Sequence, residues 1–347
     1  MEAVRIAILL LAIGKFKGER TVNGLIHLLK GKRSIQTIQD GYIFRCLTLF
    51  NTFEKLDETM IFQDIGRLKQ EGLIVDNGRY LYLTEKGKNQ LQKLLLKYPF
   101  IKMYNGWKYK DVTYPFWKRL LLFVQTLSFT AAEQYSFYPA VNDESTKHWV
   151  KTHFPKTNEA RRKWCNDIYT ELSKLLSPLP NGLANVFVSK FSGFDLLGLT
   201  NEQIREKLSL AAGDVELMLM AVLHYMLENI VSGEKNFPRL SLFVKDITQK
   251  MPLTQSAQKT FECWKKGRSI EEIARFRRLK KNTIEDHLIE IMIADPSLSI
   301  DDFVSPPLQQ TIKNVMDELQ TTKLRPIKER LEEDVSYFQI RLVLTRI

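Results

Sequence analysis

The stretch Leu253–Ala294, LTQSAQKTFECWKKGRSIEEIARFRRLKKNTIEDHLIEIMIA, contains closely spaced start and stop signals for helices. A first helix is predicted over Thr254–Trp264, because threonine is a common N-cap and Gly267 supplies the left-handed residue that ends many helices. Ser269-Ile-Glu-Glu272 then has the spacing of a capping box, in which each side chain bonds the other residue's backbone amide. A short second helix therefore begins here and continues through Ile273-Ala274.

The second half of this stretch predicts a helix-turn-helix motif. A turn, Arg275-Phe-Arg-Arg-Leu279, leads into a helix over Lys281–Leu288. Ala274 lets the two helices approach closely, and a small apolar core joins them: Ile273, Leu279, Ile284 and Leu288. In motifs of this kind the second helix can enter the major groove of DNA.

The charges of the motif both favour and oppose DNA binding. Five of the seven residues from Arg275 to Lys281 are basic, and residues 254–294 hold 9 Lys/Arg against 6 Asp/Glu, a balance of +3. Glu285 and Asp286 lie on the predicted recognition helix, where carboxylates repel phosphates unless one accepts a hydrogen bond from a cytosine amino group. The candidate DNA contacts are Arg268, Arg275, Arg277, Arg278, Lys280, Lys281 and Asn282. Alternatively each is a solvated surface charge, and the motif serves packing or protein contact.

The region before about Tyr98-Pro99 begins with three predicted helices. Leu25, Ile26, Leu28 and Leu29 form an apolar stripe that ends at Gly31, and further helices are predicted over Ser34–Phe50 and Glu58–Gln70.

A β-hairpin is predicted next. Leu73-Ile-Val75 and Tyr80-Leu-Tyr-Leu83 flank Asp76-Asn-Gly78, and Asn-Gly suits a tight turn because both residues tolerate positive φ. Thr84 then precedes a charged helix. Helices followed by a two-stranded ribbon and another helix indicate a winged helix, and the alternative is an unrelated helical domain with an exposed hairpin. Arg79, Lys86 and Lys88 around the hairpin are weaker candidates for DNA contacts.

The middle of the chain is predicted to be helical and carries no motif with a recognisable function. Leu120–Leu127 is strongly apolar, Thr200-Asn-Glu-Gln203 has the pattern of a capping box, and Ala211–Ile230 predicts a long, largely buried helix. Aromatic-rich polar pieces, Tyr135-Ser-Phe-Tyr138 and Lys147-His-Trp149, join these helices.

Length and composition agree with a multidomain globular protein. The chain has 347 residues, of which 44% are hydrophobic and 26% charged. The predicted fold class is mainly α: a winged-helix-like domain with a small β-hairpin over residues 1–100, a helical middle domain over residues 101–252 and a helix-turn-helix domain over residues 253–347. The net charge of +11 favours an anionic partner, either nucleic acid or an acidic protein surface.

Motifs for catalysis or metal binding are not found in the sequence. Gly31-Lys-Arg-Ser34 lacks the upstream glycine of a phosphate-binding loop, and no nucleotide-binding glycine motif, serine-hydrolase elbow or zinc-protease motif occurs. The five histidines do not cluster with Cys or carboxylates at metal-ligand spacing. We therefore expect no enzyme activity, no catalytic residue, no metal site and no cofactor.

The apolar N-terminal segment Ile6–Ile13 resembles a short export signal, but no small-residue cleavage site follows it, so we expect a buried first helix. Cys46, Cys165 and Cys263 are far apart and odd in number, which indicates reduced thiols. These features predict a cytoplasmic, nucleoid-associated protein that binds no membrane.

Two families resemble the C-terminal region. One part resembles the helicase helix-turn-helix at the C-terminal end of RecQ-type DNA helicases: Ser269-Ile-Glu-Glu-Ile-Ala274 with Leu279-Lys-Lys-Asn-Thr-Ile-Glu-Asp-His-Leu288. A second part looks like the closing segment of the same domain: Leu324–Glu329 with Tyr337–Val343. The motif is more broadly similar to LuxR-type regulators. It departs from them at Arg278, where a small residue is usual, and at Lys280, where serine is frequent.

Together with the N-terminal region, whose Glu71–Ile74 and Tyr80–Gly87 are similar to the wing of bacterial winged-helix proteins, the chain resembles the YpbB family of Gram-positive bacteria. This resemblance implies a non-enzymatic accessory factor in DNA metabolism whose partners are a RecQ-type DNA helicase and DNA, bound without sequence specificity. The alternatives are a DNA-binding transcription regulator and a protein-binding scaffold without DNA affinity.

Overall fold

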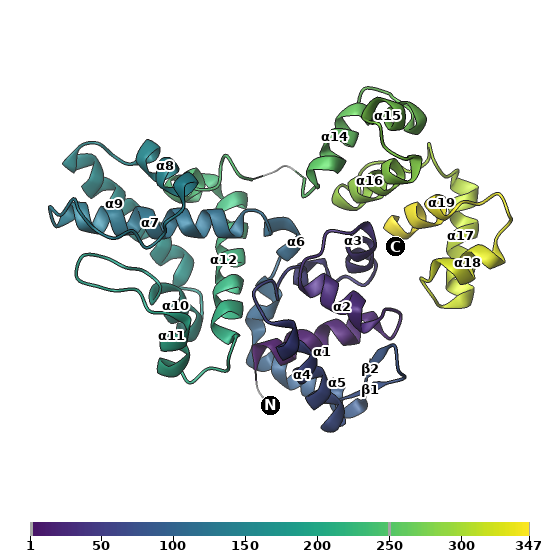
Figure 1. The fold of residues 1–347 in the computed structure, drawn as a ribbon, viewed down its shortest axis with the longest axis horizontal. Helices are drawn as coiled ribbons and strands as arrows, with labels where there is room; N and C mark the ends of the chain where they lie inside the picture. Colours follow the sequence, from purple (N-terminus) through teal and green to yellow (C-terminus); the bar gives the residue numbers. More distant parts are fainter. Residues whose placement is uncertain (1–2, 249–250, 347) are drawn as a thin grey trace. The chain divides into compact units, whose positions relative to one another are not determined.

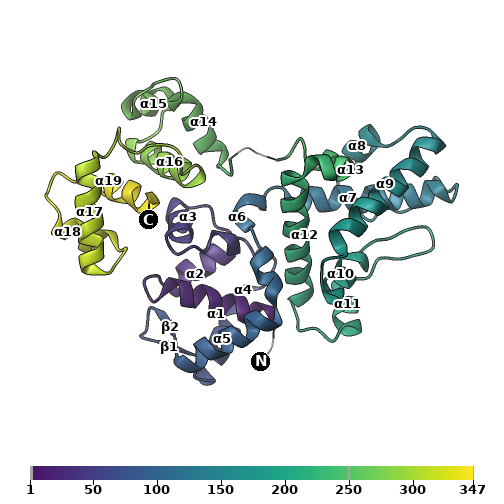
Figure 2. The ribbon, with the colours of Figure 1, turned by 180° about the vertical axis from the view of Figure 1, so that it is seen from behind.

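The computed structural model describes residues 3–248 and 251–346, and these divide into two compact units (Figures 1 and 2). The terminal unit contains residues 9–91 together with residues 251–346, so two segments far apart in the sequence belong to one unit. The middle unit contains residues 3–8 and 92–248. Two helices, α1 (Val4–Phe16) and α5 (Glu85–Lys97), contribute residues to both units.

The N-terminal part of the terminal unit has the predicted helices and hairpin. Its further elements are α2 (Val22–Leu29), α3 (Ile35–Ile43), the 3-10 turn η1 (Leu47–Leu49), α4 (Glu58–Gln70), β1 (Ile74–Asp76) and β2 (Leu81–Leu83). The strands are antiparallel, with Ile74 opposite Leu83, and Gly78 has the positive φ (+88°) that the turn requires. Thr21 also forms an isolated antiparallel β-bridge with Tyr80, the residue just before β2. The winged-helix-like order of elements is thus confirmed.

The prediction of one helix over Ser34–Phe50 was wrong, because α3 ends at Ile43. Arg45 adopts a left-handed conformation (φ +51°). The Cys46 amide donates a hydrogen bond to the Gly41 carbonyl, and the Arg45 amide donates one to the Tyr42 carbonyl. This is a Schellman ending, in which the left-handed position is usually glycine. With arginine there, the sequence carries no visible stop signal.

The C-terminal part of the terminal unit contains the helix-turn-helix. Its elements are α14 (Gln255–Trp264), α15 (Ile270–Arg277), α16 (Lys281–Ala294), α17 (Pro306–Leu319), α18 (Leu324–Arg330), α19 (Tyr337–Val343) and the 3-10 turn η4 (Leu344–Arg346). The capping box at Ser269 and Glu272 and the left-handed Gly267 (φ +77°) are confirmed. Two boundaries differ from prediction: Arg275–Arg277 are helical rather than a turn, and α16 continues six residues past Leu288.

The regular elements of the middle unit are all helices in its described residues, apart from an isolated β-bridge between Gly193 and Leu196. Its elements are the 3-10 turn η2 (Pro99–Met103), α6 (Gly106–Tyr109), α7 (Thr113–Ala131), α8 (Glu144–His153), α9 (Asn158–Leu176), α10 (Asn181–Val188), α11 (Asn201–Lys207), α12 (Asp214–Ser232), the 3-10 turn η3 (Glu234–Asn236) and α13 (Pro238–Leu242). The capping box at Thr200 is confirmed, and the predicted long helix begins at Asp214 rather than Ala211.

Helix α12 forms the core of the middle unit. In the described part of the chain it alone has the length and apolar composition of a membrane-spanning helix, yet most of it is buried against its neighbours. Tyr104 donates a hydrogen bond to the Leu217 carbonyl at 2.9 Å, and the buried His224 accepts one from the Asn105 amide at 3.1 Å. Burial lowers the pKa of His224 to about 3, so this side chain is a neutral member of the core.

The mainly α-helical fold class is therefore confirmed, with β1 and β2 forming the single sheet among the described residues. The expected burial of the first helix is confirmed as well, since Ile6 through Leu10 are wholly inaccessible to solvent.

Candidate nucleic-acid interface

Most of the basic residues predicted from the helix-turn-helix meet at one exposed corner, where α15 ends and α16 begins. We call Arg275, Arg278, Lys280, Lys281 and Asn282 the basic corner, and all five are exposed. Lys280 is the N-cap residue of α16, and no side chain caps this end of the helix. Free backbone amides and the positive end of the helix dipole therefore lie beside the basic side chains, an arrangement suited to phosphate.

The backbone at Arg278 turns the chain sharply between the two helices. This residue is left-handed (φ +53°), and its amide bonds the Arg275 carbonyl at 3.2 Å. A small residue, usually glycine, suits such a position, because a Cβ atom makes this conformation unfavourable. The arginine departs from the usual residue at this turn and adds a cation at the basic corner.

Arg277 is the exception among the predicted phosphate contacts, because its guanidinium is turned inward toward α14. It donates hydrogen bonds to the Ser256 carbonyl at 2.7 Å and the Ser256 hydroxyl at 3.0 Å, and also to the Thr260 hydroxyl. These hydrogen bonds hold α15 against α14. We therefore assign Arg277 a structural role and leave it out of the basic corner.

Two more charges border the corner. The Arg268 guanidinium lies 4.1 Å from the centre of the Phe276 ring, a cation–π contact on the surface. Lys281 forms a 3.0 Å ion pair with Glu271, and both side chains remain more than half exposed. The Glu271 carboxylate raises the pKa of Lys281, which keeps the lysine charged. An exposed pair of this kind is weak, so Lys281 can exchange its partner for a phosphate.

Beyond its first turn the predicted recognition helix is not exposed. Every residue from His287 to Ile293 is buried, because α16 packs against α14 and α15 on one side and against α3 and α19 on others. A helix that reads bases must place one face in the major groove. In α16 only the start of the helix is open, so base contacts are limited to the first turn, whose exposed side chains include cations suited to phosphate.

The two carboxylates that opposed DNA binding in the sequence lie just before this covered part of the helix and are partly exposed. Asp286 accepts a 2.7 Å hydrogen bond from Arg341 of α19. Glu285 is half-buried, and its burial raises the pKa of its carboxyl group. The contact with Arg341 offsets part of the repulsion of phosphate expected from Asp286.

The basic residues of the hairpin region lie elsewhere. Arg79, Lys86 and Lys88 are exposed, and both ribbon views show the hairpin at the opposite end of the terminal unit from α15 (Figures 1 and 2). Lys86 donates to the Glu71 carbonyl at 2.8 Å, and Lys88 pairs with Glu85 at 2.6 Å. The structure does not bring these residues to the basic corner.

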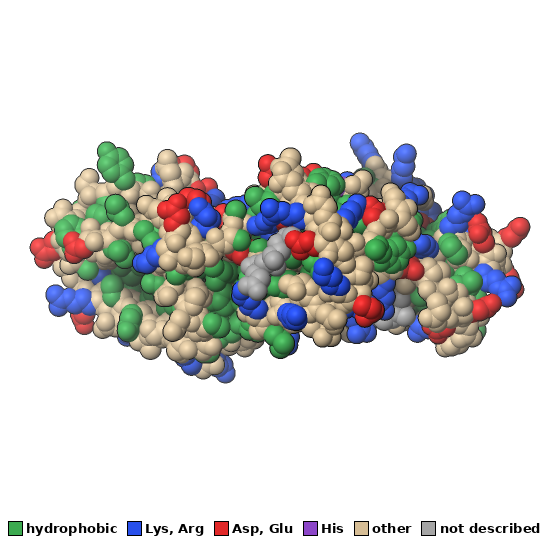
Figure 3. All heavy atoms as spheres, turned by 90° about the horizontal axis from the view of Figure 1, so that it is seen from below, with side chains coloured by type: hydrophobic (Ala, Val, Ile, Leu, Met, Phe, Trp, Pro, Cys, Tyr) green, Lys and Arg blue, Asp and Glu red, His purple; other side chains and the backbone are tan. Residues whose placement is uncertain are grey.

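The wider surface carries mixed charge. On the face in Figure 3, lysine and arginine side chains are interspersed with aspartate and glutamate rather than gathered in one field. Among residues 3–248 and 251–346, no three His, Cys, Asp or Glu side chains come together in a way that could hold a metal ion. The basic corner is therefore the site that the helix-turn-helix geometry singles out.

Comparison with known proteins agrees with this architecture. Residues 256–344 match a family described as a helix-turn-helix domain. Over 334 residues, 96% of this chain and 94% of the relative, the sequence is 31% identical to Protein YpbB of Bacillus subtilis (strain 168). No solved structure matches. The identity extends over nearly the whole of both proteins, and the chain belongs to the YpbB family.

Proposed function

We propose that this protein is a non-enzymatic accessory factor in DNA metabolism, which holds DNA by its phosphates at the basic corner and binds a RecQ-type helicase. The observation that carries the DNA part is the contrast within α16. Its uncapped first turn is exposed among cations, whereas every residue from His287 to Ile293 is buried. Phosphate contacts supply affinity and register without sequence information, so binding should be indifferent to sequence.

The helicase part of the proposal is supported by resemblance. The segments from Ser269 to Leu288 and from Leu324 to Val343 are similar to the C-terminal domain of RecQ-type helicases, and in the structure they form one helical assembly around α16. A chain of this kind would supply such a domain to a helicase in trans. No surface is assigned to the helicase.

A transcription regulator is the second candidate, and the burial of α16 argues against it. An operator-binding protein reads several base edges from its recognition helix, commonly in two copies with fixed spacing, and in α16 only the first turn is open for such contacts. The third candidate is a scaffold that binds only protein. It requires that the basic corner have no affinity for DNA. The following experiment separates all three.

DNA binding is tested with the full chain and a variant in which Arg275, Arg278, Lys280 and Lys281 are changed to glutamine. The matched control changes four exposed cations of the middle unit, Arg162, Lys163, Lys207 and Lys235, to glutamine and so has the same net charge. Fluorescence anisotropy with unrelated single-stranded, duplex and forked DNA at two salt concentrations should show at least about a tenfold loss for the corner variant.

The control variant should retain most of the affinity and salt dependence of the parent chain. Equal losses in both variants would mean that net charge, not the basic corner, governs binding. A strong preference for one duplex sequence would favour the regulator. No binding by the parent chain at low salt would favour the scaffold.

Helicase binding is tested separately, by titrating the DNA-free chain against the purified RecQ-type helicase of the same organism in a calorimeter. Saturable binding supports the accessory role, and its absence overturns that part of the proposal. ATP hydrolysis by the chain purified without helicase should be undetectable.

A further inference from the structure

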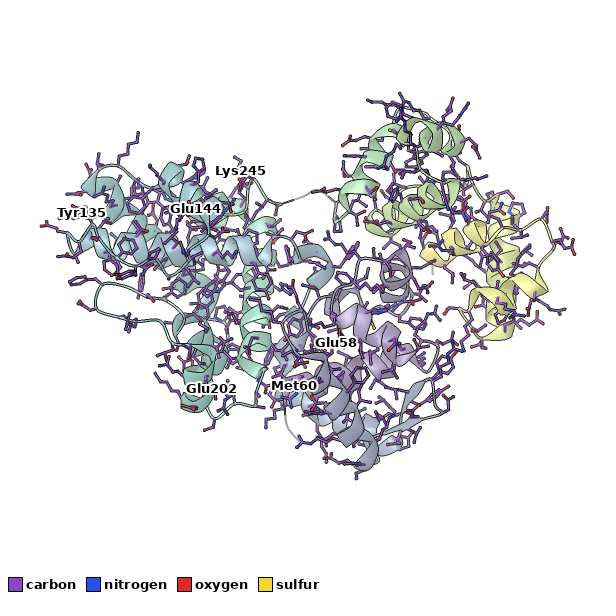
Figure 4. All side chains as sticks on the ribbon, in the orientation of Figure 1. Glu58, Met60, Tyr135, Glu144, Glu202 and Lys245 are labelled. Carbon is purple, nitrogen blue, oxygen red and sulfur yellow. The ribbon has the colours of Figure 1, made fainter. Side chains whose placement is uncertain are left out.

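The middle unit contains an open cavity of about 580 Å³ that the DNA-binding proposal does not use. It lies between α7, the connection from α7 to α8, α8 itself and the turn that begins α9. Tyr135 of that connection and Glu144, the first residue of α8, are labelled in Figure 4. The volume falls within the range of ordinary ligand sites, roughly 300–1,000 Å³.

The floor of the cavity is apolar and the side chains at its edge are basic. The apolar residues that line the cavity, which we call its floor, are Leu122, Phe137, Pro139, Val150, Phe154 and Pro155. The polar residues that line it are Thr126 and four cations, Lys147, Lys151, Lys156 and Arg161, and no acidic side chain is among the described lining residues. A ligand that fits must therefore combine apolar groups with negative charge.

Two of the four cations are uncommitted. Lys151 and Lys156 are exposed, and within residues 3–248 and 251–346 neither has an acidic partner. Lys147 pairs with Glu144 at 2.9 Å, but the Glu144 side chain is 90% exposed, so this pair is easily exchanged. Three lysines can thus turn toward an incoming anion.

Arg161 instead makes the wall of the cavity rigid. It donates hydrogen bonds to the Pro155 carbonyl at 3.1 Å and to the Asn158 side chain at 3.1 Å, and its guanidinium lies 5.5 Å from the centre of the Phe154 ring. The turn before α9 is therefore held in place without a ligand. A preformed wall lowers the conformational cost of binding.

The aromatic rings of the floor are poorly placed to stack on nucleic-acid bases. Phe137 is stacked on Phe129 with ring centres 4.5 Å apart, and Phe154 contacts Phe123 at 5.4 Å on top of its contact with Arg161. Non-specific binding of single strands relies on free aromatic faces. The remaining floor is aliphatic, which suits aliphatic and aromatic side chains of a peptide.

We propose that this cavity, which we call the basic groove, binds an acidic peptide segment of a partner protein, with one or two bulky apolar residues on the floor and carboxylates on Lys147, Lys151 and Lys156. The basic side chains favour an acidic ligand by charge complementarity. The apolar floor favours a peptide that also has bulky apolar side chains to bury. The proposal does not depend on DNA binding at the basic corner, since it concerns residues of the middle unit alone.

The probe is a fluorescein-labelled peptide, blocked at both ends, of sequence Asp-Glu-Asp-Leu-Phe-Glu-Asp. One comparison peptide replaces Leu-Phe with Ser-Ser, and another replaces the acidic residues with glutamine and asparagine. With the full chain, anisotropy should show saturable binding of the first peptide that weakens with salt. Both comparison peptides should bind at least about tenfold more weakly, because affinity needs anchors and charge together.

The site is tested with the charge reversal K151E/K156E. The matched control K163E/K207E reverses two exposed cations of the middle unit that do not line the groove. The groove variant should lose at least about tenfold in affinity while the control stays within about twofold of the parent chain. Circular dichroism establishes that both variants are folded.

Three results overturn the proposal: no binding of the acidic peptide, equal losses in both charge-reversal variants, or equal binding of the Ser-Ser peptide. Direct binding of labelled oligothymidylate that is lost in K151E/K156E, together with no peptide binding by the parent chain, would assign the groove to single-stranded nucleic acid.

Discussion

Arg341 of α19 donates a 2.7 Å hydrogen bond to Asp286 of α16, and the same guanidinium donates to the side chain of Gln39 in α3 at 2.9 Å. One side chain near the end of the chain thus ties the predicted recognition helix to the N-terminal winged-helix-like region. The Gln39 side-chain amide in turn donates a hydrogen bond to the Arg341 carbonyl at 3.0 Å. This connection adds to the packing against α14, α15 and α3 that buries most of α16.

Replacing Arg341 with alanine should destabilise the terminal unit. The arginine side chain is only 16% exposed, and its loss leaves Asp286 and Gln39 without these partners. We expect the free energy of unfolding to fall by about 1–2 kcal/mol, measured by urea denaturation, because charged hydrogen bonds contribute this much when partly screened. Arg325→Ala, which removes an exposed i,i+4 pair with Glu329, should leave stability nearly unchanged. Equal effects would show that the connection to Asp286 is unimportant.

The glycine at the end of α14 provides a test of backbone conformation alone. Gly267 has φ +77°, and a Cβ atom there would meet nothing within 4 Å, so Gly267→Ala adds strain without a clash. We expect a loss of about 1–2 kcal/mol in the free energy of unfolding. Gly66 lies within α4 in equally open space, so Gly66→Ala should stabilise by about 0.5–1 kcal/mol. Urea denaturation of both variants must therefore give changes of opposite sign.

Acid should destabilise the helix-turn-helix through His287. The side chain is buried, its Nδ1 lies 2.8 Å from the Thr260 hydroxyl, and Arg277 also points a donor at Nδ1. Burial, with the Arg277 charge second, lowers the pKa of His287 to about 4. The unfolded chain therefore binds the proton more readily than the native protein, and the stability conferred by neutral His287 is lost as pH falls from about 6.5 toward 4.

This pH dependence is checked by following the thermal midpoint between pH 7.5 and 4.5. His287→Gln keeps a side chain that can accept from Thr260 and has no titrating group, so its midpoint should fall less steeply below pH 6.5 than that of the parent chain. His148→Gln, at an exposed position, should follow the parent curve. Parallel curves for all three proteins would contradict the assignment.

Glu271→Gln should tighten DNA binding if the basic corner holds phosphates. Glu271 pairs with Lys281 at 3.0 Å, so its neutralisation removes a competitor for the lysine and a charge that repels DNA. We expect affinity for duplex DNA at low salt to rise by a factor of about two to five. Glu318→Gln, which removes an exposed carboxylate of α17, is the control. Unchanged affinity in Glu271→Gln would exclude the corner.

Local sequence pattern was sufficient for much of the fold. The capping boxes at Thr200 and Ser269, the Asn77-Gly78 turn and the left-handed Gly267 all occur where predicted, because each depends on residues a few positions apart. The end of α3 could not be predicted from the sequence. Glycine usually occupies the left-handed position that ends a helix, and here that residue is Arg45. The basic groove was missed as well. Two of its lining residues, Phe137 and Lys147, lie in the aromatic-rich pieces noted in the sequence.

Tertiary structure alone decided which face of each element is available. The sequence shows five cations among seven residues, but only folding turns Arg277 inward and leaves Arg275, Arg278, Lys280 and Lys281 outside. The contact of α16 with α3 joins residues more than 200 positions apart, and no local pattern records it. Helix formation depends on neighbours in the chain, whereas burial depends on neighbours in space, so the sequence specified the helix-turn-helix and the packing determined what it can bind.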